Sequence, residues 1–391
     1  MTAILTLILG RLPIGYLQLT HNPGRFLAAL AGVAFANVLV LVQLGLAASM
    51  TESVTTPYRL FQPDLLLLSA FEADTFADGA TVPRQRLYQA LAHPEVTGGT
   101  PTYLAQGKWQ TETNSSSIMF LGLHPDTGAF VRDDLAAPLQ SLALEDTALV
   151  DLETRFIDMS AYDGSRPDAP VPFEFKNRQL NAIGTVAIGG GFSGDGVFVV
   201  SDQTFLHLFP SRSSGTPSHI LLATRAGADP RRVSEELVQL FPEESVRIRS
   251  LADATAAEQR YQMTQRPTGL IFAFGVGIGL VVGVVIAYQV LSTDVADHIR
   301  EYATLKAMGY PTGFFAGIVL EEALILAAVG FWPGLAFSQA FYATLAHLTN
   351  IPIFMTPERA VAVFIGTLIA CSLSGVLAMR RLAAADPADL F

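Results

Sequence analysis

Four uncharged apolar runs lie along this chain, with one long polar region between the first run and the other three. A helix that crosses about 30 Å of hydrocarbon takes about 20 residues. The runs without Asp, Glu, Lys or Arg that reach this length cover 26–51, 267–293, 323–357 and 360–379. The pattern therefore predicts one transmembrane helix before the polar region and three after it.

The fold class that follows is a membrane protein with four transmembrane α-helices (1+3) and a large extracytoplasmic α+β domain between helices 1 and 2. The expected parts are a cytoplasmic N-terminal segment at 1–25, span one at 26–50, the extracytoplasmic domain at 51–266, span two at 267–292, a cytoplasmic helix at 293–312, span three at 313–347, a short extracytoplasmic loop at 348–359, span four at 360–379 and a cytoplasmic tail at 380–391.

Basic residues near the ends of the spans set the expected orientation, because Lys and Arg accumulate on the cytoplasmic side of a membrane. Six of them fall on one side if both termini are cytoplasmic: Arg11, Arg25, Arg300, Lys306, Arg380 and Arg381. Arg266, at the outer end of span two, fits this orientation poorly. We therefore expect a multi-pass protein whose polar domain is exported.

The polar domain is acidic and has no cysteine. Between Ser49 and Arg266 the chain has 17 basic and 27 acidic residues, which gives −10 of the formal net charge of −11. This balance argues against nucleic acid, or an anionic membrane surface, as the partner of the domain. The single cysteine, Cys371, lies in the last apolar run, so the domain must be held by its own core and not by disulfides.

A cleaved signal peptide is the alternative interpretation of the first apolar run, since small residues at 47–49 offer a cleavage site. The segment before the run is about 25 residues long, which is unlike the n-region of a signal peptide. Cleavage would also leave three spans. We therefore expect the run to be kept as span one.

The polar domain shows strand and helix patterns in a repeated order. The first set is a strand, a helix and a strand at 64–69, 82–92 and 100–109, and the second is the same order at 219–225, 230–241 and 246–249. Asp229 is the expected N-cap of the second helix. Further strands are expected at 117–123, 185–188 and 196–200. Two β-α-β units would therefore flank a strand-rich middle.

Motifs for catalysis or cofactor binding are weak in this sequence. Residues 189–194 (GGGFSG) formally match a dinucleotide fingerprint, but a β-branched strand follows where that motif needs a helix, which favours a tight turn between strands. No G-x-x-x-x-G-K-[ST] phosphate loop is present. His124 and Asp126 with 133–134 would suit an acid/base or metal group, although a solvated loop explains them better. We expect no cofactor, no metal site and no catalytic residues.

The segment after span two, STDVADHIREYATLKAMGYP, predicts a helix of about 15 residues, roughly 22 Å long. Asp294 and Asp297 would lie in its first turn and Lys306 in its last, which suits the helix dipole. Gly309 and Pro311 supply a stop. From the pattern alone this helix is either a solvated connector or a docking element.

Small residues spaced four apart indicate close helix packing inside the spans. Gly275, Gly279 and Gly283 form such a ridge in span two, and Gly32 belongs to another in span one. These ridges would serve either packing within one chain or the seam of a dimer.

Two polar residues inside the spans are candidates for a role in linking helices. Gln43 lies in span one, and Glu322 lies about eight residues into span three, next to Glu321. A carboxylate in a span is costly and is normally paired or turned toward protein. We expect Glu322 to be a structural link near the helix at 293–312, with simple exposure at the membrane interface as the alternative.

Three parts of the chain resemble known permeases. The phrase DHIREYATLKAMGYPTGFF is similar to the stretch after the second span in the FtsX/MacB superfamily of ABC transporter permeases, with an Arg-Glu pair at 300–301, Leu305, and an Ala-x-Gly turn at 307–309. The run 17–46, with its Gln-x-Gly step at 43–45, resembles the DevC-like family. The tail 380–387 resembles the ending of the superfamily.

The resemblance implies a permease subunit of a MacB-type exporter in the inner (plasma) membrane of a bacterium. It would work as a homodimer with a separate cytoplasmic ABC ATPase, and it would not hydrolyse ATP itself. An HlyD-type periplasmic adaptor and a TolC-like outer-membrane channel would complete the exporter, and the cargo would be a membrane lipid, a glycolipid or another amphiphile. The resemblance assigns contact with the ATPase to Asp297, His298, Arg300, Glu301, Leu305, Lys306, Met308 and Gly309.

Two further functions fit the same topology. An FtsX-like mechanotransmitter would pass the movement of the ATPase to a periplasmic partner without transporting cargo. A stand-alone receptor fits less well, since the sequence shows no kinase or other cytoplasmic output domain.

Overall fold

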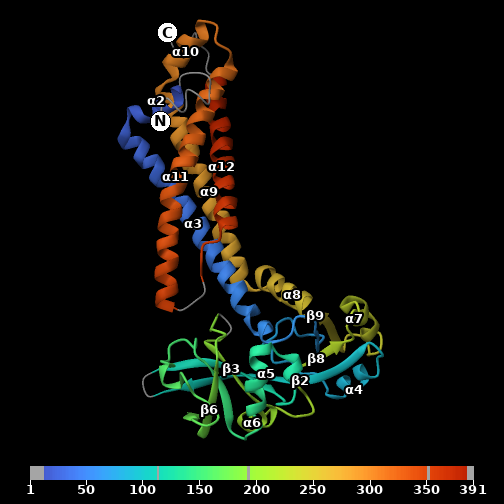
Figure 1. Ribbon diagram of the computed structural model, residues 1–391. Helices are drawn as coiled ribbons and strands as arrows, with labels where there is room; N and C mark the ends of the chain where they lie inside the picture. The colour runs from blue at the N-terminus through green and yellow to red at the C-terminus, as the bar shows by residue number, and fades with distance from the viewer. Residues whose placement is uncertain (1–12, 112–113, 192–193, 350–352, 385–391) are drawn as a thin grey trace. The chain divides into compact units, whose positions relative to one another are not determined.

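The computed structural model describes residues 13–111, 114–191, 194–349 and 353–384 (Figure 1). Contacts divide the chain into two compact units. Unit 1 takes its described residues from Met1–Ala48, Pro267–Leu348 and Ile353–Phe391, and unit 2 takes its own from Ser49–Arg266 and Thr349–Pro352.

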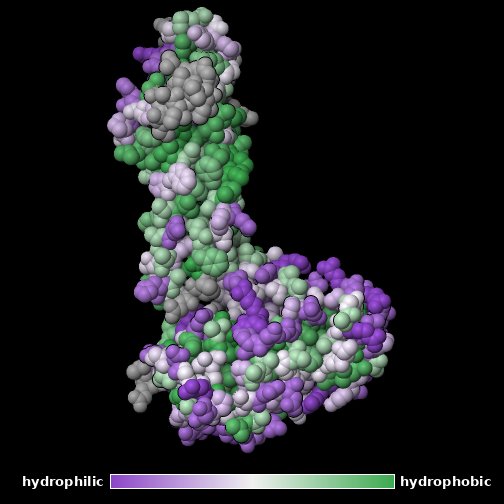
Figure 2. All heavy atoms as spheres, in the orientation of Figure 1, coloured by the Kyte–Doolittle hydropathy of each residue, from purple (hydrophilic) through white to green (hydrophobic). Residues whose placement is uncertain are grey.

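Unit 1 consists of helices. They are α2 (Ile14–His21), α3 (Pro23–Thr55, which continues into unit 2), α9 (Pro267–Asp297), α10 (Ile299–Ala307), α11 (Thr312–Thr349) and α12 (Pro357–Ala384). Within the described part of the chain, α3, α9, α11 and α12 are long and apolar enough to cross a membrane. Hydrophobic residues cover much of the surface of these helices in Figure 2. The predicted fold class, with one span before an α+β domain and three after it, is confirmed.

The helices of unit 1 share a core of aliphatic side chains. Leu291 of α9, Val319 and Leu326 of α11 and Ala378 of α12 belong to one buried cluster. α9 and α12 lie side by side along this core (Figure 1). Outward-facing positions such as Phe274 and Ile369 are also apolar and exposed, as expected for helices whose outer surface faces lipid.

Unit 2 is built on one nine-stranded sheet with the strand order β5-β6-β4-β7-β3-β2-β8-β1-β9. The strands are β1 (Leu66–Ala70), β2 (Val96–Gln110), β3 (Ser115–Leu123), β4 (Thr147–Asp151), β5 (Val171–Phe175), β6 (Arg178–Val186), β7 (Gly196–Ser201), β8 (His219–Thr224) and β9 (Val246–Ser250). The predicted strand at 185–188 overlaps only the last two residues of the longer strand β6, which ends at Val186. The other predicted strands overlap β1, β2, β3, β7, β8 and β9.

The two predicted β-α-β units interleave instead of forming separate subdomains. β1 and β2 are joined through α4 (Gln85–Leu91), and β8 and β9 through α7 (Pro230–Val238). β8 pairs with both β1 and β2, and β1 pairs with both β8 and β9, always antiparallel. In the sheet, β8 therefore lies between β2 and β1, and β1 lies between β8 and β9. This is the split β-α-β arrangement of ferredoxin-like folds. Asp229 caps α7 as predicted, accepting a hydrogen bond from the Arg231 N–H.

The long strand β2 joins the two parts of the sheet, β8-β1-β9 on one side and β5-β6-β4-β7-β3 on the other. Its first half pairs with β8 up to Thr102, and its second half pairs with β3 from Tyr103 onward. The middle also contains α5 (Asp133–Ser141), α6 (Asp202–Leu208) and the short 3-10 turns Gly128–Phe130 and Ser160–Tyr162.

Each face of the sheet carries its own buried core. On β1, Leu66 and Leu68 belong to the cluster with α4 and α7, whereas Leu67 belongs to the cluster on the other face. That second cluster includes residues of the 3-10 turn η1 (Thr56–Leu60) and of α8 (Leu251–Thr264). A strand covered on both faces has no polar side to show to water, which explains why β1 reads as a continuous apolar run.

The glycine-rich segment at 189–194 is part of a longer connection between β6 and β7. The Gly191 N–H donates to the Gly194 carbonyl at 2.7 Å, and strand β7 follows from Gly196. Among the described residues of this segment and those that follow it, strand β7 stands where dinucleotide binding needs the start of a helix. A tight turn between neighbouring strands, as the sequence suggested, is not what the structure shows, because residues 187–195 separate β6 from β7 and β4 lies between these strands in the sheet. Residues 192–193 of the segment lie outside the described residues.

Buried Asp151 holds this connection in place. Its carboxylate accepts hydrogen bonds of 3.0–3.2 Å from the backbone N–H groups of Glu153, Ile188, Gly189 and Val197. Burial raises the pKa of the Asp151 carboxyl, and the four N–H donors oppose this effect.

Gly191 lies directly against the last turns of α3. A Cβ atom at Gly191 would collide with the side chain of Ser53 and would lie 3.0 Å from the Ser53 Cα. We predict that Gly191→Ala destabilises unit 2 by about 1–3 kcal/mol, because neither backbone has room to move apart cheaply. Hydrogen exchange of the peptides that cover β4 and β7, in the purified full chain, should become faster.

The matched control is Gly215→Ala. Gly215 lies in an exposed loop, where the nearest atom to an added Cβ is 3.6 Å away. Equal exchange in both variants would mean that the contact between α3 and the loop does not stabilise the domain.

Candidate functional site

The helix predicted at 293–312 is two helices in the structure. α9 continues through Asp294 to Asp297, and α10 starts at Ile299 with His298 as its N-cap. The prediction that Asp294 and Asp297 lie in the first turn of one helix is therefore wrong, since both lie in the last turns of α9. Ala287, Leu291 and Val295 of α9 are buried in the core of unit 1, so tertiary packing carries the helix past the polar residues that suggested a start.

α10 presents one buried and one exposed face. Tyr302 and Ala303 are buried, whereas Arg300, Glu301 and Met308 are exposed. Leu305 and Lys306 are half-buried. The helix therefore has a fixed inner side and a free outer side with both signs of charge.

The end of α10 is a Schellman motif at Gly309. The Gly309 N–H donates to the Lys306 carbonyl at 3.0 Å, and the Tyr310 N–H donates to the Leu305 carbonyl at 3.2 Å. Gly309 has φ of 97°, which glycine adopts without the steric cost that a Cβ would bring. The predicted stop at this glycine is confirmed.

Tyr302 anchors α10 to the rest of unit 1. Its hydroxyl donates to Gln18 Oε1 of α2 at 3.1 Å, and its ring lies 5.6 Å from the ring of Phe315. Burial, followed by the negative charge of Glu322, raises the pKa of the Tyr302 phenol well above its usual value. No sequence pattern pairs Gln18 with Tyr302, because α2 lies before span one and the two residues are far apart in the chain.

Glu322 is fully buried where α2 meets α11. A Cβ added at Gly15 would lie 2.9 Å from Glu322 Cγ, so the two helices touch at this point. Beside it, Glu321 Oε1 accepts a hydrogen bond from the Tyr16 N–H at 3.3 Å. Within the described residues, neither carboxylate oxygen of Glu322 has a hydrogen-bond donor. Glu322 therefore lies at a helix junction and not at an exposed position.

Two polar contacts link the end of α9 to its neighbours. Arg25 of α3 forms an ion pair with Asp297, both of them partly exposed. His298 Nδ1 lies 3.0 Å from the Asp294 carbonyl oxygen and 3.6 Å from Asp294 Oδ2. A pocket with a volume of about 210 Å³ lies between these groups, and Gln18 is among its lining residues. An exposed ion pair stabilises by no more than about 1 kcal/mol, so these contacts orient the helices more than they hold them.

The predicted small residues of the spans lie at one interface within the chain. Gln43 lies over Gly275, Val40 over Gly279 and Ala36 over Gly283, while Ile286 of α9 lies over Gly32 of α3. α3 and α9 therefore approach each other closely through small residues from both helices. Of the two roles considered for these ridges, this arrangement gives a physical basis for packing within one chain.

The acidic residues near His124 do not gather around its ring in the described structure. His124 Nδ1 lies 3.9 Å from Asp126 Oδ2, and both side chains are largely exposed. Asp134 instead forms an ion pair with Arg132 at the start of α5. In the described parts of the chain, no group of three or more His, Cys, Asp or Glu side chains could hold a metal ion.

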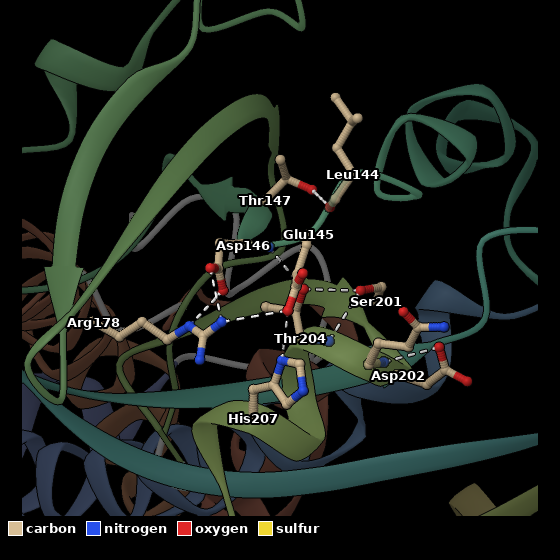
Figure 3. A network of polar contacts seen from close by, with 10 residues as sticks. Leu144, Glu145, Asp146, Thr147, Arg178, Ser201, Asp202, Thr204 and His207 are labelled. Atoms are coloured by element: carbon tan, nitrogen blue, oxygen red, sulfur yellow. Dashed lines mark hydrogen bonds and ion pairs between the residues drawn. The ribbon is translucent and has the colours of Figure 1, made fainter.

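A network of polar side chains in unit 2, at the start of β4, has a structural explanation. Arg178 donates to both carboxylate oxygens of Asp146, at 2.6 and 2.8 Å, and Glu145 bridges Arg178 and His207 (Figure 3). Asp146 has φ of 58°, and its N–H donates to Thr204 Oγ1. The network therefore holds the turn before β4, where Asp146 adopts its positive φ.

Comparisons with known proteins agree with the sequence resemblance in the membrane part. Residues 273–387 match the protein family described as FtsX-like permease C-terminal. The macrolide export ATP-binding/permease protein MacB of Nitrobacter winogradskyi is 23% identical over 137 residues, which are 35% of this chain and 21% of that protein. The chain thus spans about a fifth of the length of this curated relative.

Solved domains of two transporters resemble part of the chain. The periplasmic region of MacB from Actinobacillus actinomycetemcomitans aligns with a TM-score of 0.35 and 12% identity, covering 50% of this chain and 92% of that one. The extracellular domain of the noncanonic ABC-type transporter YknZ from Gram-positive bacteria aligns with a TM-score of 0.34 and 10% identity, covering 47% and 99%.

The contact between α3 and α9 can be tested with two glycines of the same helix. A Cβ at Gly279 would lie 2.8 Å from Val40 Cγ2, whereas nothing lies within 4 Å of a Cβ at Gly277. We predict that Gly279→Val destabilises unit 1 by about 1–3 kcal/mol through overpacking and that Gly277→Val has little effect. The apparent Tm of the detergent-purified chain should fall by several degrees in the first variant alone. A similar loss in both variants would argue against this interface.

Proposed function

We propose that this chain, which belongs to the FtsX/MacB superfamily of permeases, is the membrane subunit of an ABC exporter driven by a separate cytoplasmic ATPase. One observation carries the proposal: α10 is anchored on its inner side by Tyr302 and leaves Arg300, Glu301 and Met308 exposed on its outer side. A short rigid helix with a free charged face is what a docking element for a partner protein requires.

The contacts of α10 support a role in passing on movement. Tyr302 ties the helix to α2 and to Phe315 of α11, and α9 leads directly into it. A push on the exposed face would therefore act on several span helices together. Interfaces of packed helices change between discrete arrangements instead of deforming smoothly, so such a push can be converted into a switch.

The finer assignment follows the resemblance to DevC-like permeases. The chain would form a homodimer in the inner membrane and would work with an HlyD-type adaptor and a TolC-like channel. Its cargo would be a lipid, glycolipid or other amphiphile. The chain itself would not hydrolyse ATP, since its sequence has no phosphate loop and the ATPase would supply this step.

The second candidate is an FtsX-like mechanotransmitter that regulates a periplasmic partner without moving cargo. The same anchored helix would serve it, because both functions need an ATPase to act on the spans. Purification of the native complex, followed by identification of bound proteins and lipids, separates the two: an adaptor with bound lipid supports export, and a cell-wall hydrolase supports regulation.

The proposed orientation places both termini and α10 in the cytoplasm and unit 2 outside. We predict that a membrane-impermeant thiol reagent labels a cysteine introduced at Ser115 but not one at Thr304 in cells with an intact inner membrane, after Cys371→Ala removes the native thiol. Both positions are exposed in the structure, so a difference in labelling reports the side of the membrane. External labelling at Thr304 would reject this orientation.

The docking role of α10 can be tested by breaking the helix. Ala303→Pro removes a backbone donor within α10 and clashes with the preceding turn, at a cost of about 3 kcal/mol or more. We predict that the variant still inserts into the membrane but retains at least tenfold less of the ATPase that copurifies with the unaltered chain.

Ala303→Ser is the matched control for this test, because it changes the same buried position and keeps the backbone donor. It should retain the ATPase. Normal export by the Ala303→Pro protein with its ATPase bound would mean that α10 is only a connector.

A further inference from the structure

A buried carboxyl group joins the segment that follows α3 to the segment that precedes α9. Glu258 of α8 accepts hydrogen bonds on the same oxygen, Oε2, from the Tyr58 hydroxyl at 2.7 Å and from the Phe76 N–H at 2.9 Å. Tyr58 belongs to η1, which begins directly after α3 ends. α8 ends at Thr264, shortly before α9 begins at Pro267. All three partners lie within unit 2.

The site holds an acid in apolar surroundings. Glu258 is 3% exposed and Tyr58 is 8% exposed, and both Tyr58 and Phe76 belong to the buried cluster on that face of the sheet. Burial raises the pKa of Glu258 to about 7, and the hydrogen bonds from Phe76 and Tyr58 lower it by less. Burial, together with the charge of Glu258, also raises the pKa of the Tyr58 phenol well above its usual value.

Other charged groups around the site act weakly on Glu258. Arg266 favours its ionised form and Asp78 disfavours it, and both effects are smaller than burial. Arg249 and Asp74 line a small cavity together with Tyr58 and Phe76. These charges do not compensate the Glu258 carboxylate for the hydration that it loses on burial.

His219 of β8 extends the same set of contacts. Its ring stacks on Phe76 with centroids 4.7 Å apart, and its Nε2 lies 2.7 Å from the Phe76 carbonyl oxygen. Burial lowers the pKa of His219 to about 4, so the ring is neutral across the neutral pH range. Glu258 is therefore the group at this site that changes its charge near pH 7.

We propose that Glu258, Tyr58 and the backbone N–H of Phe76 form a proton-operated clamp between η1 and α8, closed when the Glu258 carboxyl carries a proton. The reaction is the binding of one proton to the carboxylate, and no other co-reactant is needed. With the proton bound, a neutral acid fills an apolar site and still accepts both hydrogen bonds. Without it, the site holds a desolvated negative charge, and opening toward water becomes easier.

The clamp lies where it can affect movement between the spans and the α+β domain. η1 and α8 are the two elements of unit 2 next in sequence to α3 and α9. Loosening their mutual contact would allow these segments to shift separately. This consequence rests on the proposed function, whereas the clamp itself does not.

The pH dependence of opening follows from the sign of the shift. The pKa of about 7 in the closed clamp lies above the 4.5 of an exposed glutamate, so the stability that the clamp gains is fully present below pH 4.5 and is lost as the pH rises through 7. From pH 5.5 to pH 8 the opening equilibrium should rise about 25-fold. Hydrogen exchange of the peptides covering 56–61 and 251–264 in the full chain in nanodiscs, corrected for intrinsic exchange, measures this rise.

Three variants make the measurement specific. Glu258→Gln keeps the shape and both hydrogen bonds but cannot ionise, so its opening should stay the same at both pH values. Tyr58→Phe removes one donor and keeps the acid, so opening should increase at both values while the pH step remains. Glu243→Gln changes an exposed acid and should behave like the unaltered chain.

A pH step of unchanged size in Glu258→Gln, or the absence of a step in the unaltered chain, would overturn the clamp. These experiments contain no ATPase and no cargo. Their outcome is therefore independent of whether the chain is an exporter, and a failure of export leaves the exchange result standing.

Discussion

The two segments that connect unit 2 to α3 and α9 are buried in one apolar core, and the architecture of the α+β domain depends on this shared burial. Leu60 of η1 and Leu251 of α8 belong to the same cluster as Leu67 of β1 and Leu121 of β3. Burying apolar area is the main favourable term in folding, so neither segment can leave this face without exposing part of the core. The domain therefore holds the end of one connection and the start of the other against a single sheet.

Close helix contact plays the corresponding role in unit 1. In a bilayer the lipid tails are as apolar as the side chains, so helices associate through fit and not through exclusion of water. Gly279 and Gly283 let α3 and α9 meet at short range, and Gln43 fills the space over Gly275. Small residues on one helix face larger residues on the other. Such a contact tolerates neither a larger nor a smaller side chain well.

Much of this architecture follows from sequence patterns that depend on interactions between residues close together in the chain. The spans, most strands and the caps at Asp229 and Gly309 could be predicted, because hydropathy and backbone geometry act over a few residues. The interleaving of β1 with β8 could not, since strand order is set by pairing between segments far apart in the chain. The end of α9 at Asp297 was also missed, because burial of Val295 outweighs the local signal for a helix start.

Among the candidate functional residues, sequence patterns identified those that are chemically unusual where they stand and missed those whose role comes from their partners. Glu322 was recognisable as a carboxylate inside a span, and it is fully buried at a helix junction. No local motif marks Gln18 or Glu258, and only the fold brings them to Tyr302 and Tyr58. Spacing along the chain holds no information about such contacts.

Two of the buried acids, Glu322 and Glu258, lie at joints between elements, and this placement bears on function. Burying an acid away from water costs free energy, so stability alone does not explain an acid at such a position. Glu322 lies between α2 and α11, and Glu258 lies between α8 and η1. A contact made by a polar or ionisable side chain can form again with other partners after the helices move. A tightly fitted apolar contact has only one arrangement in which it fits. Acids at these two joints therefore suit a protein whose helices must move against each other and return.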